Sequence, residues 1–443
     1  MKLPTLPHTF RHGVHPHEHK ETAAIASRRL PFVERYVLPL GQHTGAPSKP
    51  AVKVGERVLR GQLVAEANGY VSTCLHSPAT GRVSAIASHR HPAGHLTPSI
   101  EIEADPYATQ RPFPRPPVDT ESLSLDQFVS LVQKGGLVGL GGAAFPAHVK
   151  YKLPEGKKCR QLVVNGCECE PYLTADHRLM LERAEAIVRG IAILAPKLGA
   201  EGSTIGVEAN KLDAVEALCA AIKPGQKIEV LPLKVKYPQG AEKMLIKALF
   251  GVEVPGGKLP LDVGMVVNNV GTMAAIADWF DAGLPLIERL VTVAGPGIAH
   301  PANLLVPIGT PVRDVLRHCG ISPETRLVVM GGPMMGLPLA SLDVPVIKGT
   351  SGLLAMTAAE IEQPQEYNCV RCGRCLEACG NWLNPSRLAR LARAGRLDQV
   401  EANYVMDCME CGACSFACPS GIPIVQLIRT AKAAIRSSKK AAS

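Results

Sequence analysis

Short apolar runs alternate with glycines from residue 51, in the stretch AVKVGERVLRGQLVAEANGYVSTCLHSPATGRVSAI. Runs rich in β-branched residues, broken near-regularly by Gly55, Gly61, Gly69 and Gly81, are typical of small antiparallel strands joined by tight turns. The stretch DPYATQRPFPRPPVDTES then carries five prolines and predicts a stiff linker. The pattern therefore predicts a first, β-rich domain over 1–115, with the linker at its end.

The chain up to about residue 282 alternates apolar strand patterns with helical ones. The runs QLVVN, TIGVEAN, IEVLPLK and GMVVNN are separated by helical stretches, namely ADHRLMLERAEAIVRGIAILAPKLG from residue 175, KLDAVEALCAAI and AEKMLIKALFG. This alternation predicts a parallel sheet with right-handed crossovers and helices on both faces. Ser124 and Gln127 fit a capping box that begins a helix of about ten residues, which ends at Gly135 and Gly136. We predict an α/β domain over 116–283, with ligands at the carboxyl ends of its strands.

Short strands return in the third predicted domain, 284–345. RLVTVAG, ANLLVPIG and RLVVMGG surround one short helical pattern, which predicts a small α+β domain. A further linker leads to a cysteine-rich domain at 360–435. The fold class is thus multidomain α/β and α+β.

Eight of the 14 cysteines lie in two copies of the pattern CxxCxxCxxxC, as CVRCGRCLEACG and CMECGACSFACPSG. Bacterial two-cluster ferredoxins use this run: three thiolates on a tight loop hold one iron–sulfur cube, and the fourth cysteine ligates the other cube. One predicted [4Fe-4S] cluster has the ligands Cys369, Cys372, Cys375 and Cys418. The other has Cys379, Cys408, Cys411 and Cys414. Gly380 departs from the second copy, which has Pro419 at this place.

Zinc and disulfides are the alternative uses of these cysteines. A structural zinc site prefers two well-separated pairs of ligands around one ion, whereas three evenly spaced thiolates suit a cube better. Disulfides need an oxidising compartment, and the opening MKLPTLPHTFRHGVHP has no apolar segment of the kind that directs secretion. The spacing favours clusters in a reduced cytoplasm.

Composition and charge limit the remaining classes. Hydrophobic residues at 46% and charged residues at 20% are typical of a globular protein, and no apolar run approaches the roughly 20 residues of a membrane-spanning helix. The net charge of +9 permits a nucleic-acid partner, but an aromatic content of 4% leaves few stacking platforms. An anionic partner or membrane surface is favoured. The tail IPIVQLIRTAKAAIRSSKKAAS is either an amphipathic docking helix or a solvated helix end.

Three motifs outside the cysteine runs could hold a phosphate or a redox cofactor. GLVGLGGAAFPAHVKY is glycine-rich before a helix start at Pro146, so its backbone amides can approach a phosphate, and Lys150 adds a cation. Asn165, Glu168 and Glu170 in NGCECEPY follow a predicted strand, where they could orient a flavin or nicotinamide. VVNNVGT offers the same arrangement at a second strand end. Ligand-free turns are the alternative, since the glycine spacing matches neither GxGxxG nor the P-loop.

These motifs resemble a known family. GLGGAAFPAHVKY, VNGCECEPYLTADHR, YPQGAE and NNVGT are similar in order and spacing to GRGGAGFPTGLKW, NADExEPGxxKDR, YxxGEE and NNVET of the NADH-oxidising flavoprotein subunit of respiratory complex I. With QHTGAP, GGPMMG and the paired ferredoxin runs, the resemblance over nearly the whole chain is to the C subunit of the Rnf (Rsx) electron transport complex. The front module resembles biotinyl and lipoyl carrier domains, but no lysine lies between Gly61 and Gly81 to carry a group.

The resemblance implies a barrel-sandwich N-terminal module, a Rossmann-like FMN/NADH domain, a small SLBB-like β-grasp domain and a helical ferredoxin domain with two [4Fe-4S] clusters. The FMN contacts that it implies are Gly139, Gly141, Gly142, Ala143, Phe145, Lys150, Asn165, Asn268, Asn269 and Thr272. The NADH contacts that it implies are Glu168, Glu170, Tyr237 and Glu242. Leu140, Ala144, Ala241 and Gly271 depart from the complex I pattern at an arginine, a glycine and two acidic positions.

The resemblance also implies a function. NADH gives two electrons to FMN, which releases them singly to the clusters. Other subunits of a membrane-bound complex, among them ferredoxin-like or flavoprotein subunits, exchange these electrons and move ions, while this subunit lies peripherally on the cytoplasmic side. A soluble cobalamin-reductase-type flavoprotein is one alternative, disfavoured because its flavin domain is expected before the sandwich. A zinc scaffold that binds nucleic acid through its basic ends is the other, and no nucleic-acid partner is expected.

Two further clusters of side chains invite a metal interpretation. His8, His12, His15, His17 and His19 are crowded near the start, but no cysteine joins them, and the family's opening has a histidine–proline pair with no ligand duty. Cys167 and Cys169 are expected to be small buried residues that line the cleft.

Overall fold

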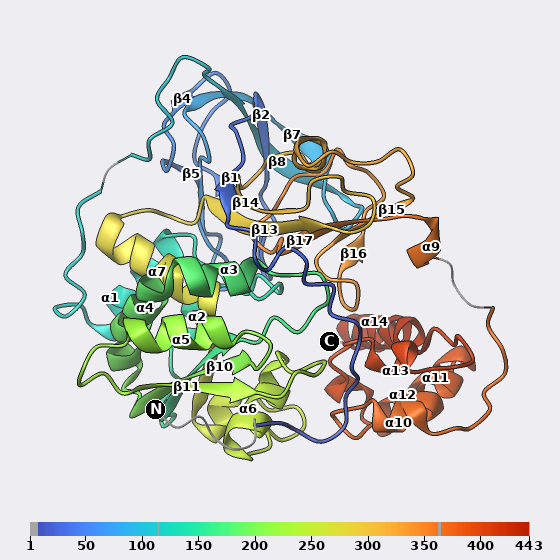
Figure 1. Cartoon of the computed structure of the whole chain (residues 1–443). Coiled ribbons are helices and arrows are strands. Elements are labelled where there is room, and N and C mark those ends of the chain that lie inside the picture. The colour runs from blue at the N-terminus through green and yellow to red at the C-terminus, as the bar shows by residue number, and fades with distance from the viewer. Residues whose placement is uncertain (1–7, 114, 362–364, 443) are drawn as a thin grey trace.

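Two small antiparallel sheets form the front module (Figure 1). The computed structural model describes residues 8–113, 115–361 and 365–442. The sheets have the strand orders β2-β8-β7-β4 and β3-β5-β6. Their strands are β2 (Arg35–Pro39), β3 (Lys49–Pro50), β4 (Arg57–Val58), β5 (Leu63–Glu66), β6 (Leu75–His76), β7 (Gly81–Arg90) and β8 (Leu96–Ala104). Tyr36, Val58, Val64 and Ile102 are fully buried between them, which gives the short strands a common core.

The first described residues of the chain belong to neither of these two sheets. Residues 8–25, which we name the N-terminal strap, run between the flavin domain and the cysteine-rich domain, as the dark blue trace in Figure 1 shows. His8 forms a parallel bridge with Leu233, and the following β1 (Arg28–Arg29) pairs with a strand of the third domain. The strap thus ties together parts that are far apart in the sequence.

The predicted parallel sheet is present in the second domain, in the order β11-β10-β9-β12. Alternate residues of β9 face opposite layers: Leu162 and Val164 pack with α1, α4 and α7, whereas Val163 packs with α6. The helix expected over 175–198 is two helices, because the chain leaves helical geometry at Arg183. The strands are β9 (Gln161–Gly166), β10 (Gly202–Glu208), β11 (Ile228–Leu233) and β12 (Met265–Asn269). The helices are α1 (Leu125–Lys134), α2 (Ala147–Tyr151), α3 (Ala175–Glu182), α4 (Ala184–Leu198), α5 (Leu212–Ala221), α6 (Glu242–Phe250), η1 (Pro260–Val263) and α7 (Val270–Ala282).

The third domain is a mixed six-stranded sheet, β1-β14-β13-β17-β15-β16, with α8 packed on it. It reaches beyond the predicted end at residue 345, because β17 pairs with both β13 and β15 near the middle of the sheet. Its elements are β13 (Glu288–Ala294), β14 (Ala302–Pro307), α8 (Val312–His318), β15 (Leu327–Met330), β16 (Leu337–Pro338) and β17 (Gly352–Met356), followed by α9 (Ala358–Ile361).

The cysteine-rich domain is helical and repeats one backbone pattern. Arg371 and Glu410 have φ of 56° and 59°, and Gly373 and Gly412 have φ of 81° and 78°, so both cysteine loops turn in the same way. Its elements are α10 (Arg374–Glu377), α11 (Pro385–Arg393), α12 (Leu397–Ala402), η2 (Val405–Asp407), α13 (Ala413–Phe416) and α14 (Ile424–Ala442). The apolar face of α14 packs with α11 in this domain's own core rather than being free for docking. Within the described residues, no helix is long and apolar enough to cross a membrane.

Candidate flavin and cluster sites

The glycine-rich loop of the flavin domain is closed at its base and open at its tip. Gly139 donates its N–H to the carbonyl of Phe145 at 2.8 Å, and the N–H of Leu140 donates to Thr272 Oγ1 at 3.0 Å. The tip, residues 141–143, is exposed, and no atom lies within 4 Å of a Cβ built at Gly142, whose φ is +104°. The open tip suits a phosphate, while Thr272 anchors the loop.

Lys150 lies beside this loop on α2 and forms an ion pair with Glu242 at the start of α6. Its Nζ also donates to the carbonyl of Val267 at 3.2 Å. Both side chains of the pair are partly exposed, at 28% for Lys150 and 43% for Glu242. The structure therefore brings together one expected flavin contact and one expected nicotinamide contact, both within reach of a ligand.

Three asparagines mark the carboxyl ends of β9 and β12. Asn165 donates to the carbonyl of Gly240 at 2.7 Å, and Asn269 Oδ1 caps α7 by accepting from the N–H of Gly271 at 2.8 Å. Asn268 accepts from Tyr151 Oη at 2.8 Å, but its buried Nδ2 has no hydrogen-bond partner among the described residues. Since buried donors are almost always paired, Asn268 Nδ2 fits a hydrogen bond to a bound group.

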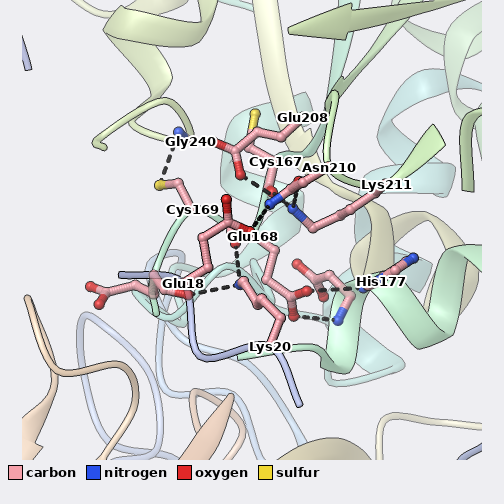
Figure 2. A network of polar contacts seen from close by, with 12 residues as sticks. Glu18, Lys20, Cys167, Glu168, Cys169, His177, Glu208, Asn210, Lys211 and Gly240 are labelled. Atoms are coloured by element: carbon pink, nitrogen blue, oxygen red, sulfur yellow. Dashed lines mark hydrogen bonds and ion pairs between the residues drawn. The ribbon is translucent and has the colours of Figure 1, made fainter. Parts of the chain in front are cut away.

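The two acids of NGCECEPY are used by the protein itself. Glu168 accepts the N–H groups of Asp176 and His177 at 2.6 and 3.1 Å, so that its carboxylate caps α3 (Figure 2). Glu170 accepts the N–H groups of Met334 and Met335 at 2.9 and 3.0 Å. Burial raises the pKa of Glu170 to about 7 despite these bonds. Sequence reasoning missed these backbone contacts, and a nicotinamide role for either acid stays a prediction.

Two lysines, of which Lys211 is buried and Lys20 is partly buried, fix the loop that carries these acids, as Figure 2 shows. Lys20 of the strap donates to the carbonyls of Glu168 and Glu170, both at 2.8 Å, and burial lowers its pKa. Lys211 donates to the carbonyl of Cys167 at 2.8 Å and forms a buried ion pair with Glu208. No local sequence signal marks Lys20, because its partners lie about 150 residues away.

Asp176 adds a second perturbed acid at this edge of the sheet. Its Oδ2 accepts from Asn269 Nδ2 at 2.6 Å. Burial, and then the nearby Glu168 carboxylate, raise the pKa of Asp176 to about 7, against the opposing effect of Arg289. The site thus contains a carboxyl group whose charge changes near neutral pH.

Cys167 and Cys169, beside this site, are neutral thiols. Cys167 is fully buried, and burial raises the pKa of both groups. Cys169 Sγ accepts from the N–H of Gly240 at 3.3 Å, so it helps to seat the turn of YPQGAE. In the described parts of the chain, no three His, Cys, Asp or Glu side chains gather around a single metal position, and the crowded histidines of the strap form no such group.

One cavity of the cysteine-rich domain contains four of the predicted cluster ligands. It is lined by Cys379, Cys408, Cys411 and Cys414, together with apolar side chains of α11 and α14. These are the four cysteines that the ferredoxin rule assigns to one cube. All 14 cysteines lie within the described residues and are free. Four thiols around an apolar cavity fit an iron–sulfur cluster.

The other four predicted ligands lie toward the surface. Cys369 and Cys372 are exposed, and Cys375 and Cys418 are partly buried. Tyr237, which the resemblance places near the nicotinamide, donates its hydroxyl to the carbonyl of Cys411 at 2.7 Å. The enclosed cysteine set therefore touches the flavin domain.

Known proteins and family models match this chain along nearly its whole length. Family models match in order a RnfC barrel sandwich hybrid domain at 8–107, a Nuo51 FMN-binding domain at 132–278, an SLBB domain at 290–338 and a 4Fe-4S dicluster domain at 365–422. The chain is 44% identical to the C subunit of the Na⁺-translocating ferredoxin:NAD⁺ oxidoreductase complex of Acetobacterium woodii, over 98% of each chain. The chain belongs to the RnfC family. These matches confirm the predicted fold class and the cofactors FMN and [4Fe-4S].

Other relatives extend the comparison. The C subunit of an ion-translocating oxidoreductase complex of Rhodobacter capsulatus is 42% identical over 99% of this chain and 88% of its own. Its counterpart from Pseudomonas aeruginosa, which has the same name, is 42% identical over 98% of this chain and 56% of its own. A chain of the NAD⁺-reducing [NiFe]-hydrogenase in the H₂-reduced state shares the fold, with a TM-score of 0.50 and 19% identity over 72% of this chain and 65% of that one.

Proposed function

We propose that this RnfC-family chain oxidises NADH, or reduces NAD⁺, at FMN and exchanges single electrons with partner subunits through two [4Fe-4S] clusters. Bound FMN exchanges two electrons with a nicotinamide as a hydride and one electron at a time with iron–sulfur clusters. The observation that carries the proposal is the cavity lined by Cys379, Cys408, Cys411 and Cys414, because it borders the flavin domain at Tyr237.

The flavin phosphate is proposed to bind at the open tip of the glycine loop, where Gly141, Gly142 and Ala143 are exposed and Lys150 supplies a positive charge. The unpaired Nδ2 of Asn268 supplies a further donor. Gly139, Phe145, Asn165, Asn269 and Thr272 shape this pocket mainly through the contacts that fix the loop and the strand ends.

NADH is proposed to bind over this pocket near Glu168, Glu170, Tyr237 and Glu242. The side chain of Glu242 is 43% exposed, whereas the carboxylates of Glu168 and Glu170 hold backbone N–H groups. In this role, the partly buried Glu168 and Glu170 fix the shape and charge of the nicotinamide site rather than contact the ligand through free oxygens.

The two clusters are proposed to act in a fixed order. The set of Cys379, Cys408, Cys411 and Cys414 lies next to the flavin domain, whereas Cys369 and Cys372 are exposed. Electrons from the flavin therefore enter at the enclosed cluster and leave through the exposed one. Partner subunits, ferredoxin-like or flavoprotein in kind, would receive them there and hold this chain at the cytoplasmic side of the membrane, where they couple the transfer to ion movement.

The test is anaerobic purification of the full chain, followed by iron, sulfide and FMN counts and by addition of NADH. We expect about eight irons and one FMN per chain, and bleaching of both flavin and cluster absorption by NADH. Zinc protein would be colourless. A preparation with full iron and FMN whose clusters stay oxidised in excess NADH would overturn the proposal.

A further inference from the structure

The N-terminal strap and the flavin domain form a short two-stranded ladder next to the cluster domain. The N–H of Val14 donates to the carbonyl of Tyr237, and the N–H of Tyr237 donates to the carbonyl of Val14, both at 2.9 Å. Gly13 permits this approach, since its φ is +96° and a Cβ there would lie 2.7 Å from the carbonyl oxygen of Tyr237. The strap is thus fixed to the flavin domain at this point.

Two side chains from this ladder reach the backbone of two predicted ligands of the enclosed cluster. Tyr237 Oη donates to the carbonyl of Cys411 at 2.7 Å. His12 Nδ1 lies 3.3 Å from the carbonyl oxygen of Cys379. Because a carbonyl oxygen only accepts, this contact requires the proton on Nδ1. The His12 ring also packs against Trp382, with ring centroids 4.0 Å apart.

The same two cysteine loops carry glycine where the other domains approach. A Cβ at Gly380 would lie 2.6 Å from Met244 Sδ and 3.2 Å from the ring of Phe10. A Cβ at Gly412 would lie 2.9 Å from the carbonyl oxygen of Met334. Strap, flavin domain and third domain therefore all close on the loops around Cys379 and Cys411.

We propose that His12 and Tyr237 are positioning residues that hold the cluster loops of Cys379 and Cys411 against the flavin domain. This inference rests on the proposed cluster ligands. Electron transfer needs a short, constant separation between donor and acceptor, and the two hydrogen bonds act on the backbone of two proposed ligands of one cluster. The strap, which no function has yet explained, then serves to keep the electron path closed.

Position 12 allows matched variants, because Nδ2 of Asn is the same number of covalent bonds from Cα as Nδ1 of His. H12N keeps a donor for the Cys379 carbonyl and tolerates the left-handed backbone of residue 12, whose φ is 69°. H12F keeps a ring against Trp382 but has no donor. His15 is exposed, so H15F is the control for an aromatic substitution in the strap.

The first readout needs no turnover. Hydrogen–deuterium exchange of the full chain with its cofactors is followed in peptides that cover 379–382 and 408–412, with peptides of α11 as the internal reference. We expect faster exchange at 379–382 in H12F and at 408–412 in Y237F, and wild-type exchange in H12N and H15F. Unchanged exchange in both H12F and Y237F would overturn the proposal.

The second readout separates flavin and cluster reduction after anaerobic mixing with NADH. In H12F we expect flavin bleaching at the wild-type rate and cluster reduction slowed about two- to tenfold, the factor that corresponds to one lost hydrogen bond. H12N should restore the rate. Equal cluster reduction in H12F and H15F, at equal iron content, would overturn the positioning role. If the wild-type clusters do not respond to NADH, the proposed function fails. The exchange measurement then still tests whether His12 and Tyr237 hold the two cysteine loops.

Discussion

Serine substitutions at Cys379 and Cys418 test whether the two cysteine runs exchange their fourth ligands. Cys379 belongs to the first run in the sequence, yet it lines one cavity with Cys408, Cys411 and Cys414 of the second run, whereas Cys418 does not line that cavity. Serine removes one thiolate of one cube, so each variant should lose one cluster and about half of the iron. The missing cluster should differ between the two variants.

The assay compares C379S and C418S with the reference variants C408S and C369S. After anaerobic purification, iron and sulfide are counted, and the clusters are reduced with dithionite for electron paramagnetic resonance. C379S should show the spectrum of C408S, and C418S that of C369S. Because the enclosed set borders the flavin domain at Tyr237, NADH should reduce the remaining cluster in C418S but not in C379S.

The opposite grouping would refute the reasoning. If C379S matches C369S and C418S matches C408S, each run ligates its own cluster and the cavity is misassigned. Full iron in C379S would exclude Cys379 as a ligand. Cys219, a free, partly buried cysteine on α5, supplies the control, since C219S should keep the full iron content and both signals.

Three further changes test the flavin site and the domain contact. K150M should weaken FMN binding about tenfold in a fluorescence titration, which is the value of one charge-assisted hydrogen bond at a partly exposed site. The control E242Q should bind FMN at least as well as wild type. If K150M binds FMN with wild-type affinity, Lys150 is not part of the flavin site. The pKa of Asp176 is raised in the folded protein, so its ionisation costs stability between about pH 4 and pH 7. The melting temperature of D176N should therefore rise relative to that of wild type over this interval. Parallel plots of melting temperature against pH for the two proteins would contradict the raised pKa. G380A should destabilise the protein by about 1 kcal/mol. This is the low end for overpacking, because the Met244 side chain is flexible. A denaturation midpoint equal to that of wild type would show that Met244 and Phe10 move aside without cost.

The sequence predicted those elements whose signals are local. Ser124 and Gln127 form the expected capping box, and α1 extends from Leu125 to Lys134 as the pattern indicated. The break at Arg183 was missed because the residues on both sides continue a helical pattern, while the chain must turn there to place α3 beside the strand ends and α4 on the sheet. Local periodicity carries no information about such a turn.

Residues of the candidate site divide in the same way. The cysteine spacing predicted one set of four ligands, Cys379, Cys408, Cys411 and Cys414, and the fold places all four around one cavity. Motif similarity predicts that Glu168 and Glu170 lie near a ligand, which stays a prediction, but it does not predict that their carboxylates accept N–H groups of α3 and of the loop before β16. No sequence pattern predicted the role of Lys20, because the carbonyl groups to which it donates lie about 150 residues away in the chain. A motif identifies where a residue lies, but its hydrogen-bond partners depend on tertiary contacts.

At Gly380, a departure in the sequence pattern is explained by tertiary contacts. In the sequence it is a departure, since the second cysteine run has Pro419 at the same place. In the fold it is the point where the first run meets Phe10 and Met244, and a larger residue would have to displace them. The two runs share a backbone pattern but have different surroundings, so one cysteine set is enclosed beside the flavin domain and the other opens to solvent. The packing around one run therefore distinguishes the two cysteine sets: one lies beside the flavin domain, and the other includes the exposed Cys369 and Cys372.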